Sequence, residues 1–185
     1  MGDMNIDLSG KVALVTGGSR GLGKAIALAM AEKGAKVTIC GRKQENLVRA
    51  REEFQKQGLE VMARSAHVAK SDQVADLFQA INEQFGGLDV LVNNVGMNLL
   101  TPSVSEADEG VWDKIIESNL KGTFLVSREG VKLLKKRGGG KIVNITSVAA
   151  RRAARGMGIY CVAKAAVEML TKVLAVELAQ DQINV

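Results

Sequence analysis

The sequence predicts one α/β domain in which helices cover both faces of a doubly wound parallel sheet. Short apolar runs rich in β-branched residues alternate with longer helical segments, and no second block of strands follows. These runs are continuously apolar, as is typical of strands buried on both faces. Hydrophobic residues make up 46% and charged residues 24% of the 185 residues, a balance that fits one globular domain. Twenty glycines against one proline indicate tight turns rather than linkers.

The first half of the chain repeats a strand–helix unit. The run at 12–16 (VALVT) is the first expected strand, and a glycine-rich turn at 17–23 leads from it into an apolar helix that ends at Gly34. The units that follow are a strand at 36–40, a helix at 43–57, a strand at 59–66, a helix at 71–85 and a strand at 88–92. Strands that alternate with helices in this way are expected to lie parallel in one sheet.

The second half has longer elements. Residues 93–110 read as a loop, because Thr101-Pro102 marks a break in any helix or strand. The elements expected after it are a long helix at 111–137, a strand at 141–146, a second long helix at 158–180 and a strand that starts at 183.

Charge, cysteine content and hydropathy argue against several classes of protein. The net charge of +5 is modest and is not interleaved with aromatic residues, so no nucleic-acid partner is expected. No apolar run approaches the 18 residues of a membrane span. Cys40 and Cys161 lie far apart and no spacing of cysteine and histidine suggests zinc, so neither a disulfide nor a metal site is expected. Acidic residues in the first segment, MGDMNIDL, are unlike a secretory leader, so a cytoplasmic protein is expected.

The turn between the first strand and the first helix predicts an anion site. Its glycines are Gly17, Gly21 and Gly23, with Thr16 just before them. Free backbone N–H groups and the positive end of the helix dipole meet there, and they suit the pyrophosphate of a dinucleotide. This spacing differs from the common G-x-G-x-x-G pattern, although the physical demands are similar. The alternative, an ordinary tight turn, is weakened by the strand–turn–helix context.

The end of the second strand predicts which dinucleotide binds. A unit that binds NAD carries Asp or Glu about 20 residues past the turn, to accept hydrogen bonds from the ribose. This chain has Cys40-Gly41-Arg42-Lys43 there instead. An arginine suits a 2′-phosphate, and Arg20 in the turn can reach the same side, so NADP is favoured over NAD. The alternative is that Arg42 and Lys43 simply begin a solvated helix.

Four polar residues form a candidate catalytic set. Tyr160 and Lys164 are four residues apart on an expected helix and share one face. A nearby ammonium favours the phenolate form of a tyrosine, which makes Tyr160 a usable general acid or base. Ser147 follows a strand at the carboxyl edge of the sheet, where ligands of open α/β sheets bind. Asn119 interrupts an apolar helical stripe, and asparagine is a poor residue for a helix interior.

Four motifs in order resemble the short-chain dehydrogenase/reductase family. They are TGGSRGLG at 16–23, NNVG at 93–96, Asn119 within ESNLKGTF, and ITS…YCVAK at 145–164. The resemblance covers the whole chain and is closest to β-ketoacyl-acyl-carrier-protein reductases and related sugar or secondary-alcohol dehydrogenases. It implies a Rossmann-type sheet and hydride transfer between a nicotinamide and a carbonyl or secondary alcohol. It also implies a homodimer or homotetramer whose subunits meet through the long helices at 111–137 and 158–180.

The resemblance also implies roles for single residues. Lys164 would bind the nicotinamide ribose, and Asn119 would place a water in a proton relay to that lysine. Asn93 would steady the sheet while the loop after it lines the adenosine. Two positions depart from the family pattern, since Val95 replaces alanine and His67-Val68 replaces Asp-Val beside the adenine. The residues expected to contact the cofactor are Gly17, Ser19, Arg20, Gly21, Leu22, Gly23, Arg42, His67, Val68, Asn93, Val95, Gly96, Tyr160 and Lys164.

The substrate side is less determined by the sequence. Family members continue past the strand at 183 into a substrate-covering helix and a last strand, so 1–185 reads as a single NAD(P)-binding domain without those parts. An alternative function is therefore a dinucleotide-binding module without turnover. Arg151, Arg152 and Arg155 lie between Ser147 and Tyr160, where they would bind a phosphate, a carboxylate or an acidic carrier domain, or remain solvated loop residues.

Overall fold

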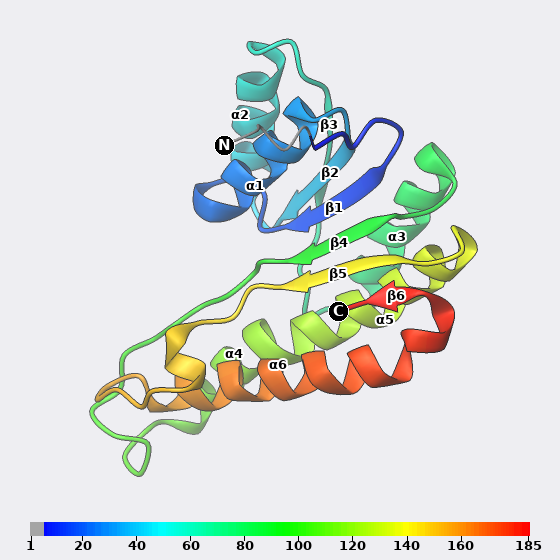
Figure 1. Cartoon of the computed structure of the whole chain (residues 1–185). Helices are drawn as coiled ribbons and strands as arrows, with labels where there is room; N and C mark the ends of the chain where they lie inside the picture. The colour runs from blue at the N-terminus through cyan, green and yellow to red at the C-terminus, as the bar shows by residue number, and fades with distance from the viewer. Residues whose placement is uncertain (1–5) are drawn as a thin grey trace, which may run out of the picture.

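Six parallel strands form one sheet in the computed structural model, which describes residues 6–185 (Figure 1). The strand order is β3-β2-β1-β4-β5-β6, and every neighbouring pair is parallel. The strands are β1 (Val12–Thr16), β2 (Lys36–Gly41), β3 (Val61–Ser65), β4 (Val90–Asn93), β5 (Gly140–Asn144) and β6 (Ile183–Asn184). This order confirms the doubly wound, Rossmann-type sheet, in which the direction of winding reverses between β1 and β4.

Helices cover the sheet from both sides. They are α1 (Gly21–Glu32), α2 (Gln44–Gln55), α3 (Ser71–Phe85), α4 (Glu109–Ile116), α5 (Gly122–Lys136) and α6 (Gly158–Glu177). Figure 1 shows α1 and α2 on one face, and α3, α5 and α6 on the other. None of the helices within residues 6–185 combines the length and the apolar character that a bilayer crossing demands.

The long helix expected at 111–137 differs in detail. It begins at Glu109, where the Asp108 carboxylate accepts from the backbone N–H of Val111 at 3.3 Å, and it ends at Lys136. A π-helical turn at Glu117–Lys121 separates α4 from α5. Such turns are rare inside helices and frequent at functional sites, and this one carries Asn119.

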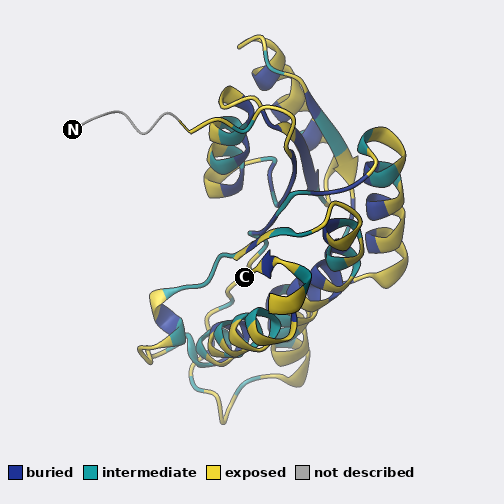
Figure 2. Ribbon diagram, turned by 45° about the vertical axis from the view of Figure 1, so that its right-hand side comes forward, coloured by how far each residue is buried: buried dark blue, intermediate teal, exposed yellow. Residues whose placement is uncertain are grey.

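Two hydrophobic layers enclose the sheet. Side chains alternate along β1, so Val12 and Leu14 pack on the α3 and α5 side, while Ala13 and Val15 pack on the α1 and α2 side. All five residues of β1 are buried, and Figure 2 shows buried residues concentrated on the strands and the inner helix faces. The centre of the sheet therefore supplies the rigid floor from which the strand ends project.

The α1 and α2 face is open over β5. Ile142 on the opposite face is 3% exposed, whereas Val143 is 45% exposed. Val143 pairs in register with Val92 of β4, which in turn pairs with Val15. No helix within residues 6–185 lies over Val143, since α1 and α2 cover β1 to β3 (Figure 1).

Candidate active site

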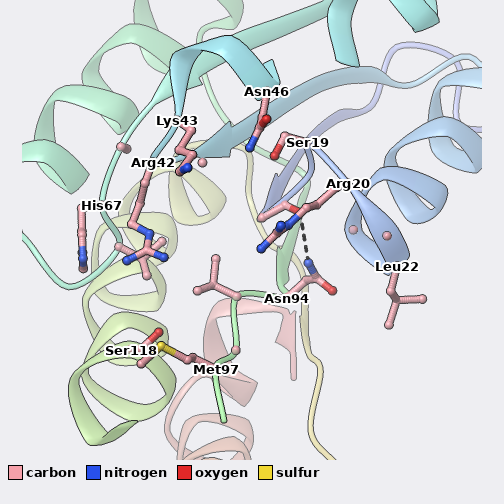
Figure 3. Close-up of a pocket in the computed structure, with 18 residues that line it drawn as sticks. Ser19, Arg20, Leu22, Arg42, Lys43, Asn46, His67, Asn94, Met97 and Ser118 are labelled. Atoms are coloured by element: carbon pink, nitrogen blue, oxygen red, sulfur yellow. Dashed lines mark hydrogen bonds between the residues drawn. The ribbon is translucent and has the colours of Figure 1, made fainter. Parts of the chain in front are cut away.

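A cavity of about 560 Å³ lies at the carboxyl ends of β1 to β4 (Figure 3). The residues that follow these strands form its wall, together with Ser118 from the π-helical turn. It spans the position between β1 and β4 where the strand order reverses, and its size is that of a ligand pocket. The lining residues are Gly17, Ser19, Arg20, Gly21, Leu22, Gly23, Gly41, Arg42, Lys43, Asn46, Ala66, His67, Val68, Asn94, Val95, Gly96, Met97 and Ser118.

The glycine turn forms one wall of this cavity as a cradle of backbone. Gly17 has a φ of 65°, a conformation that side chains rarely allow. A Cβ on Gly23 would collide with the Asn94 amide nitrogen and with the Gly17 carbonyl oxygen. Arg20, the N-cap of α1, makes no side-chain capping bond, so the first N–H groups of α1 remain available to an anion. The turn therefore fits the phosphates of a dinucleotide.

Thr16 and Asn94 hold the two sides of the cradle together. The Thr16 hydroxyl accepts from the backbone N–H of Asn94 at 2.9 Å, and the Asn94 amide donates to the Thr16 carbonyl at 2.9 Å. Asn94 lines the cavity, although the sequence had directed attention to its neighbour, Asn93. The Asn93 side chain is buried away from the cavity and donates to Ser127 and Asn144 at 2.9 and 2.8 Å. Alternation along β4 is the reason, because consecutive side chains point to opposite faces.

Positive charge lines the part of the cavity that follows β1 and β2. Arg20, Arg42 and Lys43 all line it, and both arginines are exposed. Neither arginine forms an ion pair with any residue in 6–185, whereas Lys43 lies 3.9 Å from Glu45. Figure 3 shows both guanidinium groups facing the same space. Two free guanidinium groups suit a phosphate at this end.

His67 forms the far end of the cavity beside Arg42 (Figure 3). Its Nδ1 accepts a hydrogen bond from the backbone N–H of Ala69 at 3.2 Å. Partial burial lowers the pKa of this imidazole, and the charges of Arg42 and Lys70 lower it further. The ring is therefore neutral at physiological pH.

Asn119 and Lys164 converge on Gly96 at the other end. A Cβ on Gly96 would lie 3.2 Å from both the Asn119 Oδ1 and the Lys164 Nζ. Asn119 is fully buried, and its amide donates to the carbonyls of Met97 and Ile115 at 2.7 and 2.8 Å. Its Oδ1 accepts from the Met97 backbone N–H at 3.2 Å. Asn119 thus ties the loop after β4 to the π-helical turn.

Lys164 presents a buried amine between two strands and α6. Its Nζ donates to the carbonyl of Ile145 at 2.9 Å and lies 5.8 Å from the centre of the Tyr160 ring. Burial lowers the pKa of Lys164. Tyr160 and Lys164 share one face of α6, as their spacing predicts.

Ser147 follows β5 and caps a short 3₁₀ turn at Val148–Ala150. Its hydroxyl accepts from the backbone N–H of Ala149 at 3.2 Å and keeps its own proton free to donate. Both Ser147 and Tyr160 are half-buried. The structure thus places Ser147, Asn119 and the Tyr160–Lys164 pair at the same carboxyl edge as the cradle, although they do not line the cavity itself.

Several lining residues escaped sequence reasoning. Asn94 and Met97 follow β4, Gly41 ends β2, and Asn46 lies in the first turn of α2, so their closeness to a strand end was an available signal. Ser118 reaches the cavity through the π-helical turn, which has no recognisable pattern in the sequence. The fold places Ser118 across the cavity from the glycine turn, and only the tertiary structure shows this.

Comparisons with known proteins agree with this geometry. The family model for short chain dehydrogenases matches residues 11–185. A short-chain type dehydrogenase/reductase of Picea abies is 40% identical over 96% of this chain and 68% of its own. Dehydrogenase/reductase SDR family member 4 of Sus scrofa is 41% identical over 96% of this chain and 64% of its own.

Solved structures show the same relationship. A short-chain type dehydrogenase/reductase of Mycobacterium marinum is 34% identical and superposes with a TM-score of 0.92. The match covers 97% of this chain and 73% of the other. One from Mycobacterium ulcerans is 28% identical with a TM-score of 0.93, over 97% of this chain and 66% of its own. The chain therefore belongs to the short-chain dehydrogenase/reductase family, the oxidoreductases that act on CH–OH or carbonyl groups with NAD(P).

Proposed function

We propose that this protein transfers hydride between NADP(H) and a small molecule with a ketone, β-ketoacyl or secondary-alcohol group, with Tyr160 as general acid and base. The observation that carries the proposal is the convergence of Asn119 and Lys164 on Gly96, at the edge where the phosphate cradle ends. A dinucleotide held by the cradle and the Arg42 side would extend along the cavity toward this point. When bound, NADP(H) supplies the hydride donor or acceptor.

The residues near Gly96 handle the proton and the substrate oxygen. In the reducing direction Tyr160 gives its hydroxyl proton to the carbonyl oxygen of the substrate, and in the oxidising direction it takes that proton back. Lys164 lies beside the ring and favours the phenolate that remains. The free proton of Ser147 donates to the same substrate oxygen and orients it. Asn119 acts as a positioning residue, because both of its amide protons already hold the loop and the helix.

Replacing Tyr160 with phenylalanine tests the chemistry. We expect turnover of NADPH with a panel of ketones and β-ketoesters to fall by about 10² to 10⁴-fold, because the proton donor is lost. Dinucleotide binding, measured by nicotinamide fluorescence, should be unchanged. A Tyr160→Phe variant that keeps its rate contradicts the mechanism.

The preference for NADP is tested at Arg42. Removing this guanidinium should weaken NADPH binding about tenfold or more, since hydrogen bonds to charged groups contribute about 1.5–3 kcal/mol. NADH lacks the 2′-phosphate, so its affinity should hardly change. Arg49 lies on α2, the helix that follows Arg42, and does not line the cavity, so Arg49→Ala is the matched control. Equal losses of NADPH and NADH binding in Arg42→Ala would count against the preference.

A dinucleotide-binding module without turnover is the second candidate. It is favoured by the exposure of Val148, which directly follows Ser147 and is 82% exposed, so nothing within residues 6–185 covers it. The same assay separates the two functions. Tight binding of NADPH together with no turnover of any carbonyl compound supports the second.

The exposed apolar residues of α5 and α6 support a homodimer or homotetramer. Phe124 on α5 is 45% exposed, and on α6 Met169 and Val176 are 57% and 80% exposed. Apolar surface of this kind commonly marks contacts between subunits. Sedimentation of the wild type and of Val176→Asp checks this, with a shift toward monomer expected in the variant.

The arginines after β5 support a substrate that carries an acidic group, such as one attached to a carrier. Arg151 forms an ion pair with Glu168, whose carboxylate lies 3.0 Å from the guanidinium. Arg152 and Arg155 form no ion pair within residues 6–185 and remain available for a phosphate or a carboxylate. A fall in substrate affinity on changing both to alanine, with Arg137→Ala as control, checks their role.

A further inference from the structure

Ser147 lies on a segment that has left the sheet and is held mainly from one side. β5 ends at Asn144, and the 3₁₀ turn at Val148–Ala150 follows Ser147 directly. This turn packs against α6 (Figure 1). Val148 in the turn is 82% exposed, whereas Ala149 is buried. The position of Ser147 therefore depends on what α6 contributes to this segment.

One face of α6 reaches the segment at two points. Tyr160, Lys164 and Glu168 are spaced by four residues, so they follow one another along the same face of the helix. Lys164 donates to the carbonyl of Ile145 at 2.9 Å. Glu168, one helical turn further on, accepts from Thr146. The helix face that carries the proposed proton donor thus also holds the chain that leads to Ser147.

The Glu168 carboxylate bridges the two ends of the segment. Thr146, just before Ser147, donates from its Oγ1 to the Glu168 Oε1 at 3.3 Å. Arg151, at the end of the 3₁₀ turn, donates from its Nε, which lies 3.2 and 3.0 Å from the two carboxylate oxygens. The hydrogen bond from Arg151 holds the pKa of Glu168 below its usual range, so the carboxylate is charged at physiological pH. Only 19% of the Glu168 side chain is exposed, against 78% for Arg151, so Glu168 is the anchored member of the pair.

Thr146 passes the contact with Glu168 on to Ser147. A threonine hydroxyl has one proton to donate and lone pairs with which to accept. With the Thr146 proton directed at Glu168, its oxygen accepts from the backbone N–H of Ser147. The same hydroxyl lies 3.4 Å from the Ser147 carbonyl, but a charged carboxylate is the stronger acceptor. Glu168 therefore sets the orientation of the peptide group that precedes the Ser147 side chain.

We propose that Glu168 is a positioning residue for Ser147, because its carboxylate clamps Thr146 and Arg151 on either side of the turn that presents the Ser147 hydroxyl. The inference rests on the proposed function, in which this hydroxyl orients the substrate oxygen. Without the carboxylate, the Thr146 proton turns to another acceptor and the Arg151 end of the turn is released. The Ser147 hydroxyl then shifts relative to Tyr160, and the substrate oxygen is held less well.

Two substitutions of similar length remove the clamp by different amounts. Glu168→Met removes both contacts, whereas Glu168→Gln keeps one uncharged acceptor. Glu177→Met is the matched control on the same helix, since Glu177 is exposed and forms no ion pair within residues 6–185. Urea unfolding establishes that each variant is folded under the conditions of the assay.

The experiment is a double-mutant cycle with Ser147→Ala, measured as kcat/KM for the reduction of the ketone and β-ketoester panel by NADPH. We expect Glu168→Met to lower kcat/KM by roughly tenfold and Glu168→Gln to lower it less, because a small misplacement of an orienting group slows the reaction. In the Ser147→Ala background, Glu168→Met should change kcat/KM by less than about twofold, because the group that it positions is already absent. Glu177→Met should keep the wild-type value.

Amide hydrogen exchange gives a second measurement that needs no turnover. The backbone N–H of Ala149 donates to the Ser147 Oγ at 3.2 Å. If Glu168 holds the turn, this N–H should exchange faster in Glu168→Met than in the wild type and in Glu177→Met. Equal exchange in all three proteins would contradict the clamp.

Other outcomes overturn the proposal in distinguishable ways. If the losses of Glu168→Met and Ser147→Ala multiply in the double variant, Glu168 does not act through Ser147, while the proposed function stands. A Glu168→Met variant that loses stability but keeps its kcat/KM has the same consequence. If the folded wild type reduces no carbonyl compound of the panel, the proposed function fails and the role of Glu168 fails with it.

Discussion

One row of residues across the sheet contrasts the two halves of the molecule. Ile39, Val15, Val92 and Val143 pair in register on the face that α1 and α2 cover. The first three are 0%, 0% and 3% exposed, and Val143 is 45% exposed. All four side chains are β-branched and apolar, so the sequence alone treats them as equivalent. Whether a helix lies over each strand is what separates them.

The two halves are accordingly stabilised by different interactions. The half built on β1, β2 and β3 is packed from both sides, and its phosphate cradle consists of backbone atoms above a buried floor. In the half built on β4, β5 and β6, the residues of the proposed catalytic set are held by hydrogen bonds, such as those of Asn119 to Met97 and of Lys164 to Ile145. The proposed dinucleotide end therefore rests on a packed floor, with hydrogen bonds of Thr16 and Asn94 joining its two sides, whereas buried polar contacts alone tie down the proposed catalytic residues Asn119 and Lys164.

Among the changes that test this contrast between the halves, the largest expected effect lies where they meet, at Gly23. A methyl group there must displace the Asn94 amide and the Gly17 carbonyl, and overpacking of this kind costs about 1–3 kcal/mol. We expect Gly23→Ala to weaken NADPH binding by roughly 100-fold, because the cradle can no longer close. Gly86→Ala is the control: Gly86 has a positive φ that alanine strains, but it has open space around it and lies outside the cavity. That variant should lose stability and keep its affinity. Equal affinity in both variants would contradict the cradle.

The contrast along the row predicts unequal costs for the same substitution. Val15→Ala removes two buried methyl groups, about 0.8 kcal/mol each plus the cost of the cavity, so about 2 kcal/mol of unfolding free energy should be lost. Val143→Ala should cost less than about 1 kcal/mol, since its side chain already contacts solvent. Urea unfolding of both variants measures the difference. Equal losses would show that Val143 is covered in solution, for instance by a second copy of the chain.

The smallest expected effect is a pH dependence from Lys164. Burial lowers its pKa below the value of 10.5 in the unfolded chain, so between these two values only the unfolded state binds the proton. Stability contributed by Lys164 should therefore rise with pH in that window, with a slope of at most about 1.4 kcal/mol per pH unit. The measurement is the unfolding free energy of the wild type minus that of Lys164→Met from pH 7 to 10.5. If the difference in unfolding free energy between the two proteins does not change with pH, the Lys164 amine is solvated in the folded protein.

Local pattern was sufficient for most of the fold. The strand at 12–16 and the glycine turn after it were predicted at the observed positions, because buried parallel strands are continuously apolar and a tight turn before a helix needs glycine. Boundaries elsewhere differ by a few residues, as with the strand expected at 141–146 and observed at Gly140–Asn144. The break at Glu117–Lys121 was not predicted: Asn119 interrupts the apolar stripe there, but one polar residue in a helical stripe does not indicate a π-helical turn.

The sequence by itself determined the order of the elements and the position of the glycine turn, and it singled out the residue types of the proposed catalytic set, because each depends on neighbours along the chain. The tertiary structure alone decided that Asn94 rather than Asn93 faces the cavity, that Ser118 joins it, and that Lys164 and Asn119 meet at Gly96. These features depend on which face a strand end turns toward and on which segments cross there. Which residues meet at the site depends on distances through space, and the pattern of residues along the chain does not contain these distances.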